Sequence, residues 1–143
     1  MKLTITAAAA LFLVGCSAPK PKTSTPKLSL NGEWNIIEAN DTTVDTTAMQ
    51  FNPTIAFDIA KRELGGCAGC NSFTGKMSID TIKQTIKIDE VAQTLMLCPG
   101  IETERRVFSA LNDAAGYRQY ADTCIALTDA KGRVVMRLQQ HNK

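Results

Sequence analysis

Apolar and polar residues alternate along most of the chain after about residue 30. In the segment 54–59, Ile55, Phe57 and Ile59 fall on one face, which is the pattern of a half-buried β-strand. The polar segment 40–47 is expected to be a loop, and the run 91–97 is expected to extend the strand at 85–88. Apolar runs between turn residues predict further strands at 34–37, 63–67, 71–79, 85–88, 117–120, 125–127 and 134–138.

The spacing changes over residues 102–115, where it predicts one amphipathic helix. Glu102 and Glu104 occupy its first turn, where the helix dipole favours negative charge, and Gly116 follows as a stop signal. The apolar positions recur at helical spacing: Val107, Phe108, Leu111 and Ala115. The charged positions are expected to form the solvated face: Glu102, Glu104, Arg105 and Arg106.

These elements predict an α+β fold, a small antiparallel, barrel-like β-sheet domain packed with one amphipathic helix. The predicted domain covers residues 30–140, which is long enough for one core. Trp34 is expected to lie in that core. The composition, 44% apolar and 21% charged residues, is that of an ordinary globular chain.

Charge and histidine content exclude several classes of function. The formal net charge of +2 gives no electrostatic basis for binding nucleic acid. His141 is the one histidine and lies near the C-terminus, which argues against a Ser-His-Asp triad, a Cys-His dyad or a multi-histidine metal site. We therefore predict no catalytic residue, no metal and no cofactor.

The first residues have the layout of a secretory signal. Lys2 supplies the positive start, and the apolar core from Ile5 to Val14 is too short to span a bilayer. The sequence Leu-Val-Gly-Cys at 13–16 resembles the bacterial lipobox, in which the cysteine becomes the lipidated N-terminus. We therefore predict a signal peptide at 1–15 and lipid attachment at Cys16, which would anchor the chain to a membrane.

Residues 16–29 are expected to be a flexible tether because they are rich in proline, lysine and hydroxyl residues. Its lysines could contact anionic headgroups or peptidoglycan, but a plain spacer is the favoured interpretation. Ser17 stands where an inner-membrane retention signal would resemble Asp, and no acidic run follows Cys16. The expected location is the cell envelope, on the periplasm-facing side of the outer membrane.

Four cysteines follow Cys16, and an even number in an exported chain predicts disulfides. They allow three connectivities, between which spacing does not choose. The first two form a CxxC, so thiol–disulfide redox chemistry is an alternative, although the residues after it are poor helix formers and such a site needs a helix N-terminus. A zinc site lacks a second CxxC. The four are Cys67, Cys70, Cys98 and Cys124.

A set of short motifs resembles the META domain, or HslJ-like, family. The set comprises GCNSFTG at 69–75, PTIAF at 53–57, TLMLC at 94–98 and a Gly-x-Trp strand start at 32–34. A Glu-bearing helix at 104–111 and a closing hairpin at 127–138 continue the match. The resemblance covers about residues 30–139 and implies a small antiparallel sheet domain with one helix, usually in an envelope lipoprotein or secreted protein.

The resemblance also implies a disulfide pairing. Cys67 stands where the family usually has another residue, and Cys124 is a second additional cysteine. The implied bonds are Cys70–Cys98 and Cys67–Cys124. Some family members are linked to stress and heat-shock responses or drug resistance, and the family supplies no catalytic residue to carry across.

The glycine-rich motif has a structural interpretation of its own. Glycines permit turns with positive φ, the asparagine can hydrogen-bond nearby backbone, and the phenylalanine can enter the core. A ligand cradle is the alternative, but the spacing is not that of a phosphate-binding loop. The motif residues taken as structural are Gly69, Cys70, Asn71, Phe73 and Gly75.

The function expected from these features is that of a non-enzymatic envelope lipoprotein with a binding or structural role in the periplasm, linked through its family to envelope or heat stress. The alternative is a periplasmic redox protein that uses Cys67 and Cys70. We expect a monomer that is held at the membrane through Cys16 and has an envelope protein as its partner.

Overall fold

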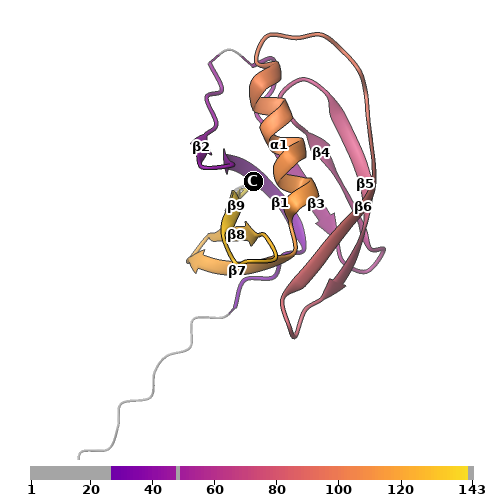
Figure 1. Ribbon diagram of the computed structural model, residues 1–143, viewed down its shortest axis with the longest axis vertical. Coiled ribbons are helices and arrows are strands. Elements are labelled where there is room, and N and C mark those ends of the chain that lie inside the picture. The colour runs from indigo at the N-terminus through magenta and orange to yellow at the C-terminus, as the bar shows by residue number, and fades with distance from the viewer. Residues whose placement is uncertain (1–26, 48, 142–143) are drawn as a thin grey trace, which may run out of the picture.

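The computed structural model describes residues 27–47 and 49–141 (Figure 1). The predicted signal peptide, Cys16 and most of the predicted tether lie outside these residues. In the described ranges, no helix is long and apolar enough to cross a membrane. The elements are β1 (Gly32–Ala39), β2 (Thr42–Thr43), β3 (Thr54–Asp58), β4 (Glu63–Cys67), β5 (Ser72–Asp80), β6 (Thr85–Gln93), α1 (Ile101–Asp113), β7 (Gly116–Ala121), β8 (Cys124–Thr128) and β9 (Val134–Gln140).

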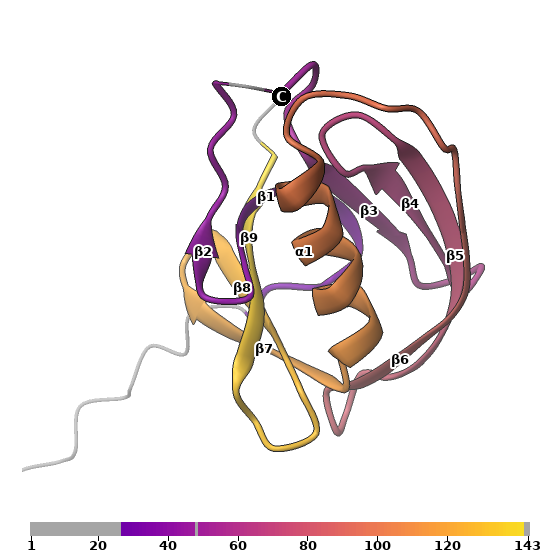
Figure 2. The same cartoon turned by 45° about the horizontal axis from the view of Figure 1, so that its top comes forward.

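The strands form one antiparallel, ring-like sheet with a single helix beside it (Figure 2). Its order is β2-β1-β3-β4-β5-β6-β7-β8-β9, and an additional pairing of β1 with β9 returns the last strand to the first. Most neighbours in the ring are also neighbours in sequence, because short hairpin turns join them. The predicted antiparallel sheet with one helix is therefore confirmed.

The ring is held unevenly at two of its junctions. β1 and β9 pair over five residue positions, from Trp34–Gln140 to Ala39–Met136. β6 and β7 pair at one position, Thr85–Gly116. We call this narrow junction the β6–β7 seam. The C-terminal end of α1, which leads into β7, lies next to it in Figure 2.

The core lies inside the ring, where alternate strand residues meet the apolar side of α1. Trp34 is buried, and its indole Nε1–H donates to the carbonyl of Leu30 at 2.9 Å. On the helix, Val107 and Leu111 are buried, and Phe108 packs edge-on against Phe73 with ring centroids 5.5 Å apart. The helix thus fills the interior that the sheet alone leaves open.

Several boundaries differ from the sequence prediction, and the predicted loop 40–47 contains the short strand β2. The helix ends at Asp113, because Ala114 is extended, and Gly116 starts β7 instead of stopping the helix. β6 ends at Gln93, so the predicted strand through residue 97 is wrong beyond that point. The folded part also begins before residue 30: Leu28 packs against the core, and its N–H donates to Gln119 Oε1 at 2.8 Å.

Candidate functional site

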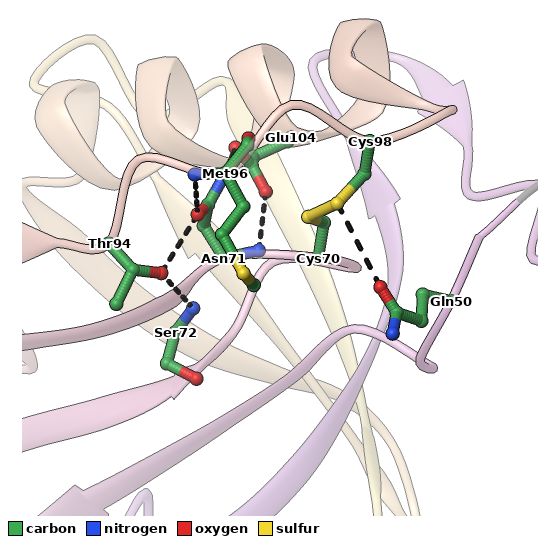
Figure 3. The surroundings of a disulfide bond; sticks show 8 residues. All are labelled: Gln50, Cys70, Asn71, Ser72, Thr94, Met96, Cys98 and Glu104. Carbon is green, nitrogen blue, oxygen red and sulfur yellow. Dashed lines mark hydrogen bonds between the residues drawn. A yellow bond between two sulfur atoms is a disulfide. The ribbon is translucent and has the colours of Figure 1, made fainter.

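Asn71 is the centre of a buried hydrogen-bond cluster between the β4–β5 turn, the segment after β6 and the start of α1 (Figure 3). Its Oδ1 accepts from Met96 N–H at 2.7 Å and from Thr94 Oγ1 at 2.8 Å. Its Nδ2 donates to Met96 O at 3.1 Å and to Glu104 Oε1 at 2.7 Å. Both amide hydrogens and both oxygen lone pairs are therefore used.

The side-chain amide of Asn71 pairs with Met96 as a neighbouring strand would. It accepts from the N–H and donates to the C=O of the same residue. The segment after β6 is thus kept in place by a side chain where the β5 ladder has ended. This explains why the motif carries asparagine. Its amide has an acceptor oxygen and a donor nitrogen on separate atoms, whereas serine has a single hydroxyl and leucine has no polar atom.

Glu104 is the second member of the cluster, and its burial corrects the predicted solvated face of the helix. It is 5% exposed, and its carboxylate accepts from the backbone N–H and the side chain of Asn71. The backbone bond is 2.8 Å long. Glu104 lies three and seven residues before Val107 and Leu111, so the spacing of the buried positions could have placed it on the inner face.

A disulfide between Cys70 and Cys98 joins the same two segments, with Cα atoms 6.2 Å apart. This is the pairing that the family resemblance implied. Cys70 directly precedes Asn71, so the covalent and the hydrogen-bonded connection act on the same turn. Figure 3 shows Gln50 against the bond, with its Oε1 3.9 Å from Cys98 Sγ.

The second implied bond, Cys67–Cys124, is wrong because both cysteines are free. Cys67 lies on β4 and Cys124 on β8, and three strands separate β4 from β8 in either direction around the ring. A disulfide needs Cα atoms within about 7 Å. The two residues lie across the ring from each other and cannot meet this limit without rearrangement.

The other motif residues have structural positions. Gly69 has a φ of +113°, and a Cβ built on it would lie 2.9 Å from Met49 Sδ, so the turn requires glycine. Phe73 is buried in the core, as the sequence predicts. Gly75 is buried opposite the bulge of β6, where a Cβ would meet Val91 and Asp89 at 3.3 Å. The motif therefore shapes one end of the ring.

The segment that this cluster holds is apolar and exposed. Leu95, Met96 and Leu97 are 87%, 49% and 99% exposed. We call these three residues the apolar tip. Phe51, also exposed, approaches the same turn through its N–H, which donates to Gly69 O at 3.1 Å. Large apolar side chains that are held this far into solvent are typical of an interaction surface.

A shallow depression of about 280 Å³ adjoins the apolar tip between β5 and β6. The depression is open to solvent, so it would not exclude water from a reaction. Its lining residues are Ser72, Phe73, Thr74, Ala92, Gln93 and Thr94.

Few side chains away from the apolar tip are candidates for metal binding or catalysis. In the ranges 27–47 and 49–141, no group of three or more His, Cys, Asp and Glu residues could hold a metal ion. The pKa of Tyr120 is raised, chiefly by partial desolvation of a side chain that is 46% exposed. Cys124 Sγ donates to Gln139 Oε1 at 2.9 Å, and Arg137 lies over the Tyr120 ring. This cluster joins the neighbouring strands β7, β8 and β9.

Comparison with known proteins gives a family and a fold. The sequence profile of the META domain matches residues 26–142. A DUF4847-family protein from Bacteroides vulgatus has a similar fold, with a TM-score of 0.53 and 15% identity over 80% of this chain and 95% of that chain. A protein from Burkholderia xenovorans is similar with a TM-score of 0.60 and 18% identity, over 79% and 83% of the two chains. No curated protein matches the chain.

Proposed function

The chain belongs to the META domain family, and we propose that it is a non-enzymatic lipoprotein of the bacterial envelope that binds a partner protein through the apolar tip. The domain would be held at the outer membrane, facing the periplasm, by a lipid on Cys16. A role under envelope or heat stress is part of the proposal and is supported by the family resemblance alone.

One observation carries the binding role: the apolar tip is exposed and yet held in place from both sides. Three side-chain hydrogen bonds of Asn71, with Thr94 and Met96, and the Cys70–Cys98 disulfide hold the segment on either side of Leu95 and Leu97. A fixed loop loses little conformational entropy when a partner covers it. Burying a leucine side chain contributes roughly 1.5–3 kcal/mol, so two leucines are enough to matter in an interface.

The redox alternative is less well supported. A redox CxxC cycles between a dithiol and a bond between its own two cysteines. In this chain Cys70 is bonded to Cys98, and Cys67 is left as a thiol on β4. We therefore favour the structural role for the disulfide.

Site-specific photo-crosslinking in the producing cells tests the binding role. A photoreactive residue at Leu97 should give a discrete protein adduct, and one at Ile82 should not. Ile82 is a matched control because it is an equally exposed aliphatic residue, at 92%, in the β5–β6 turn. Equal labelling from both positions, or none from Leu97, would overturn the binding role.

The lipid anchor has a separate test. Mass spectrometry of the N-terminal peptide should find acyl chains on Cys16, and Cys16→Ser should move the protein out of the membrane fraction. An unmodified cysteine would overturn the anchor and leave the binding role to be judged by crosslinking.

A further inference from the structure

We infer that the partner of the apolar tip binds as an extended peptide strand, which pairs with the open edge of β6 and places apolar side chains against Val91 and Leu95. This inference rests on the proposed function and specifies the kind of partner that the surface fits.

The first observation is that β6 has one paired side and one open side over most of its length. It pairs with β5 from Thr85 to Gln93. On its other side, the ladder to β7 consists of the single pair Thr85–Gly116, next to which Ile86 N–H donates to Ala115 O. In the described part of the chain, no backbone hydrogen bond is recorded on that side for residues 87–93.

The second observation is that the open edge continues into the apolar tip. Thr94 N–H donates to Ser72 O, and Met96 N–H donates to Asn71 Oδ1, so both point toward β5 and its turn. Peptide groups alternate in direction along an extended chain. The N–H groups of Gln93 and Leu95 therefore point away from β5, and within the described residues neither has a backbone partner.

The edge also offers apolar contacts beside its free backbone groups. Val91 is exposed at the bulge, and Leu95 and Leu97 follow on the same chain. Charged residues and a bulge interrupt the edge at Glu90, which has a φ of +51°. Natural sheets use such features to prevent indiscriminate edge pairing. Here they restrict the partner to a peptide whose backbone fits around the bulge.

A peptide strand fits these observations better than a lipid surface does. Apolar side chains alone could enter a bilayer, but the free N–H and C=O groups beside them would enter it unpaired, which is strongly unfavourable. A strand satisfies both kinds of group at once.

A second copy of the chain is also disfavoured. Two β6 strands paired antiparallel about the middle of residues 87–93 would place Glu90 opposite its own copy, and like charges directly opposite each other are destabilising.

The test uses the chain from residue 17 to its C-terminus and a phage-displayed library of random peptides. We expect the selected peptides to alternate apolar and polar residues. Gln93→Pro removes the outward N–H without touching the β5 ladder, whereas Gln93→Ala keeps it. Affinity for a selected peptide should fall about tenfold or more in Gln93→Pro and remain unchanged in Gln93→Ala. Amide spectra of both variants establish that they are folded.

A second arm uses Leu95→Asp, which should also abolish binding, with Ile82→Asp as its control. Peptides without alternation, or equal binding by the proline and alanine variants, would overturn the inference.

Crosslinking from Leu97 in the same Gln93 variants separates the two proposals. An adduct that is lost with proline and kept with alanine supports both. An adduct that persists with proline overturns strand pairing and leaves the binding role intact. Absence of the adduct in every variant overturns both.

Discussion

Asn71 is the residue on which the arrangement of the candidate site depends. It is 2% exposed, and its partners are a carboxylate, a hydroxyl and the backbone of Met96. Removing one member of a fully satisfied buried network leaves the others unpaired, which costs more than the net value of the lost bonds.

We therefore expect Asn71→Ala to lower the free energy of unfolding by about 3 kcal/mol, because it leaves the buried Glu104 carboxylate with one of its two donors. Urea denaturation measures the loss. Asn35→Ala is the control: Asn35 makes one exposed contact, with His141, so the change should be under about 1 kcal/mol. Equal effects of the two substitutions would show that the cluster contributes no special stability.

The disulfide gives a second prediction at this scale. Non-reducing digestion and mass spectrometry should find Cys70–Cys98, with Cys67 and Cys124 as thiols. Of the two, Cys67 should react faster with an alkylating reagent because Cys124 is buried. Cys98→Ser should cost about 3–4 kcal/mol, since the bond closes a loop of 28 residues. Finding a Cys67–Cys70 bond instead would restore the redox alternative.

The sequence indicated that Asn71 is structural, but it did not identify its partners. Glu104 follows 33 residues later, and local patterns carry no information about such a distance. The helical spacing of Glu104, Val107 and Leu111 was a usable signal, yet a glutamate in the first helical turn has an equally good explanation through the helix dipole. The prediction of a Cys67–Cys124 bond was wrong for a similar reason. The order of the strands decides which cysteines lie close together, and local patterns do not give that order.

At the scale of elements, period-two alternation located most of the strands because most of them bury one face, although β8 is buried along its whole length. The errors are the short strand β2, which lies inside the predicted loop 40–47, and the ends of other elements. The apolar run through residue 97 was expected to continue β6, but β6 ends at Gln93, and Leu95 and Leu97 are exposed in the apolar tip. Local departures of this kind from the pattern are expected at functional surfaces.

The turns between strands predict how stability depends on pH. Backbone N–H groups of Lys61 and Lys83 hold the pKa values of Asp58 and Asp80 below the ordinary value of 3.8. A lowered native pKa stabilises the fold above the unfolded pKa, and this contribution is lost as pH falls through the native value. Stability should therefore be constant near neutral pH and decline below about pH 4.

Substitution tests the part played by one turn. Asp80→Asn should reduce the acid-induced decline in the urea midpoint, whereas Asp122→Asn should leave it unchanged. Asp122 is exposed in the turn between β7 and β8, and among the described residues its side chain makes no hydrogen bond. A decline of the same size in Asp80→Asn as in the parent chain would mean that this turn does not contribute.

At the scale of the whole molecule, the ring has one strong and one weak junction. β1 and β9 bring the ends of the domain together over five paired positions, whereas β6 and β7 meet at one. Helix α1 packs against β1, β6 and β9, so it contacts β6 next to the narrow junction. We therefore expect the β6–β7 seam to open while the rest of the ladder remains intact.

Amide hydrogen exchange should reveal this asymmetry. The seam amides of Ile86 and Tyr117, which donate to Ala115 O and Gln84 O, should exchange at least about tenfold faster than those of the β1–β9 ladder. Opening the seam breaks the pairing at one position, whereas separating β1 from β9 breaks it at five and exposes Trp34 and Leu138. Along the segment after β6, Thr94 and Met96 should be protected and Gln93 and Leu95 should not. Uniform protection at both junctions would mean that the ring opens only by global unfolding, and the β6–β7 seam would then be no weaker than the β1–β9 ladder.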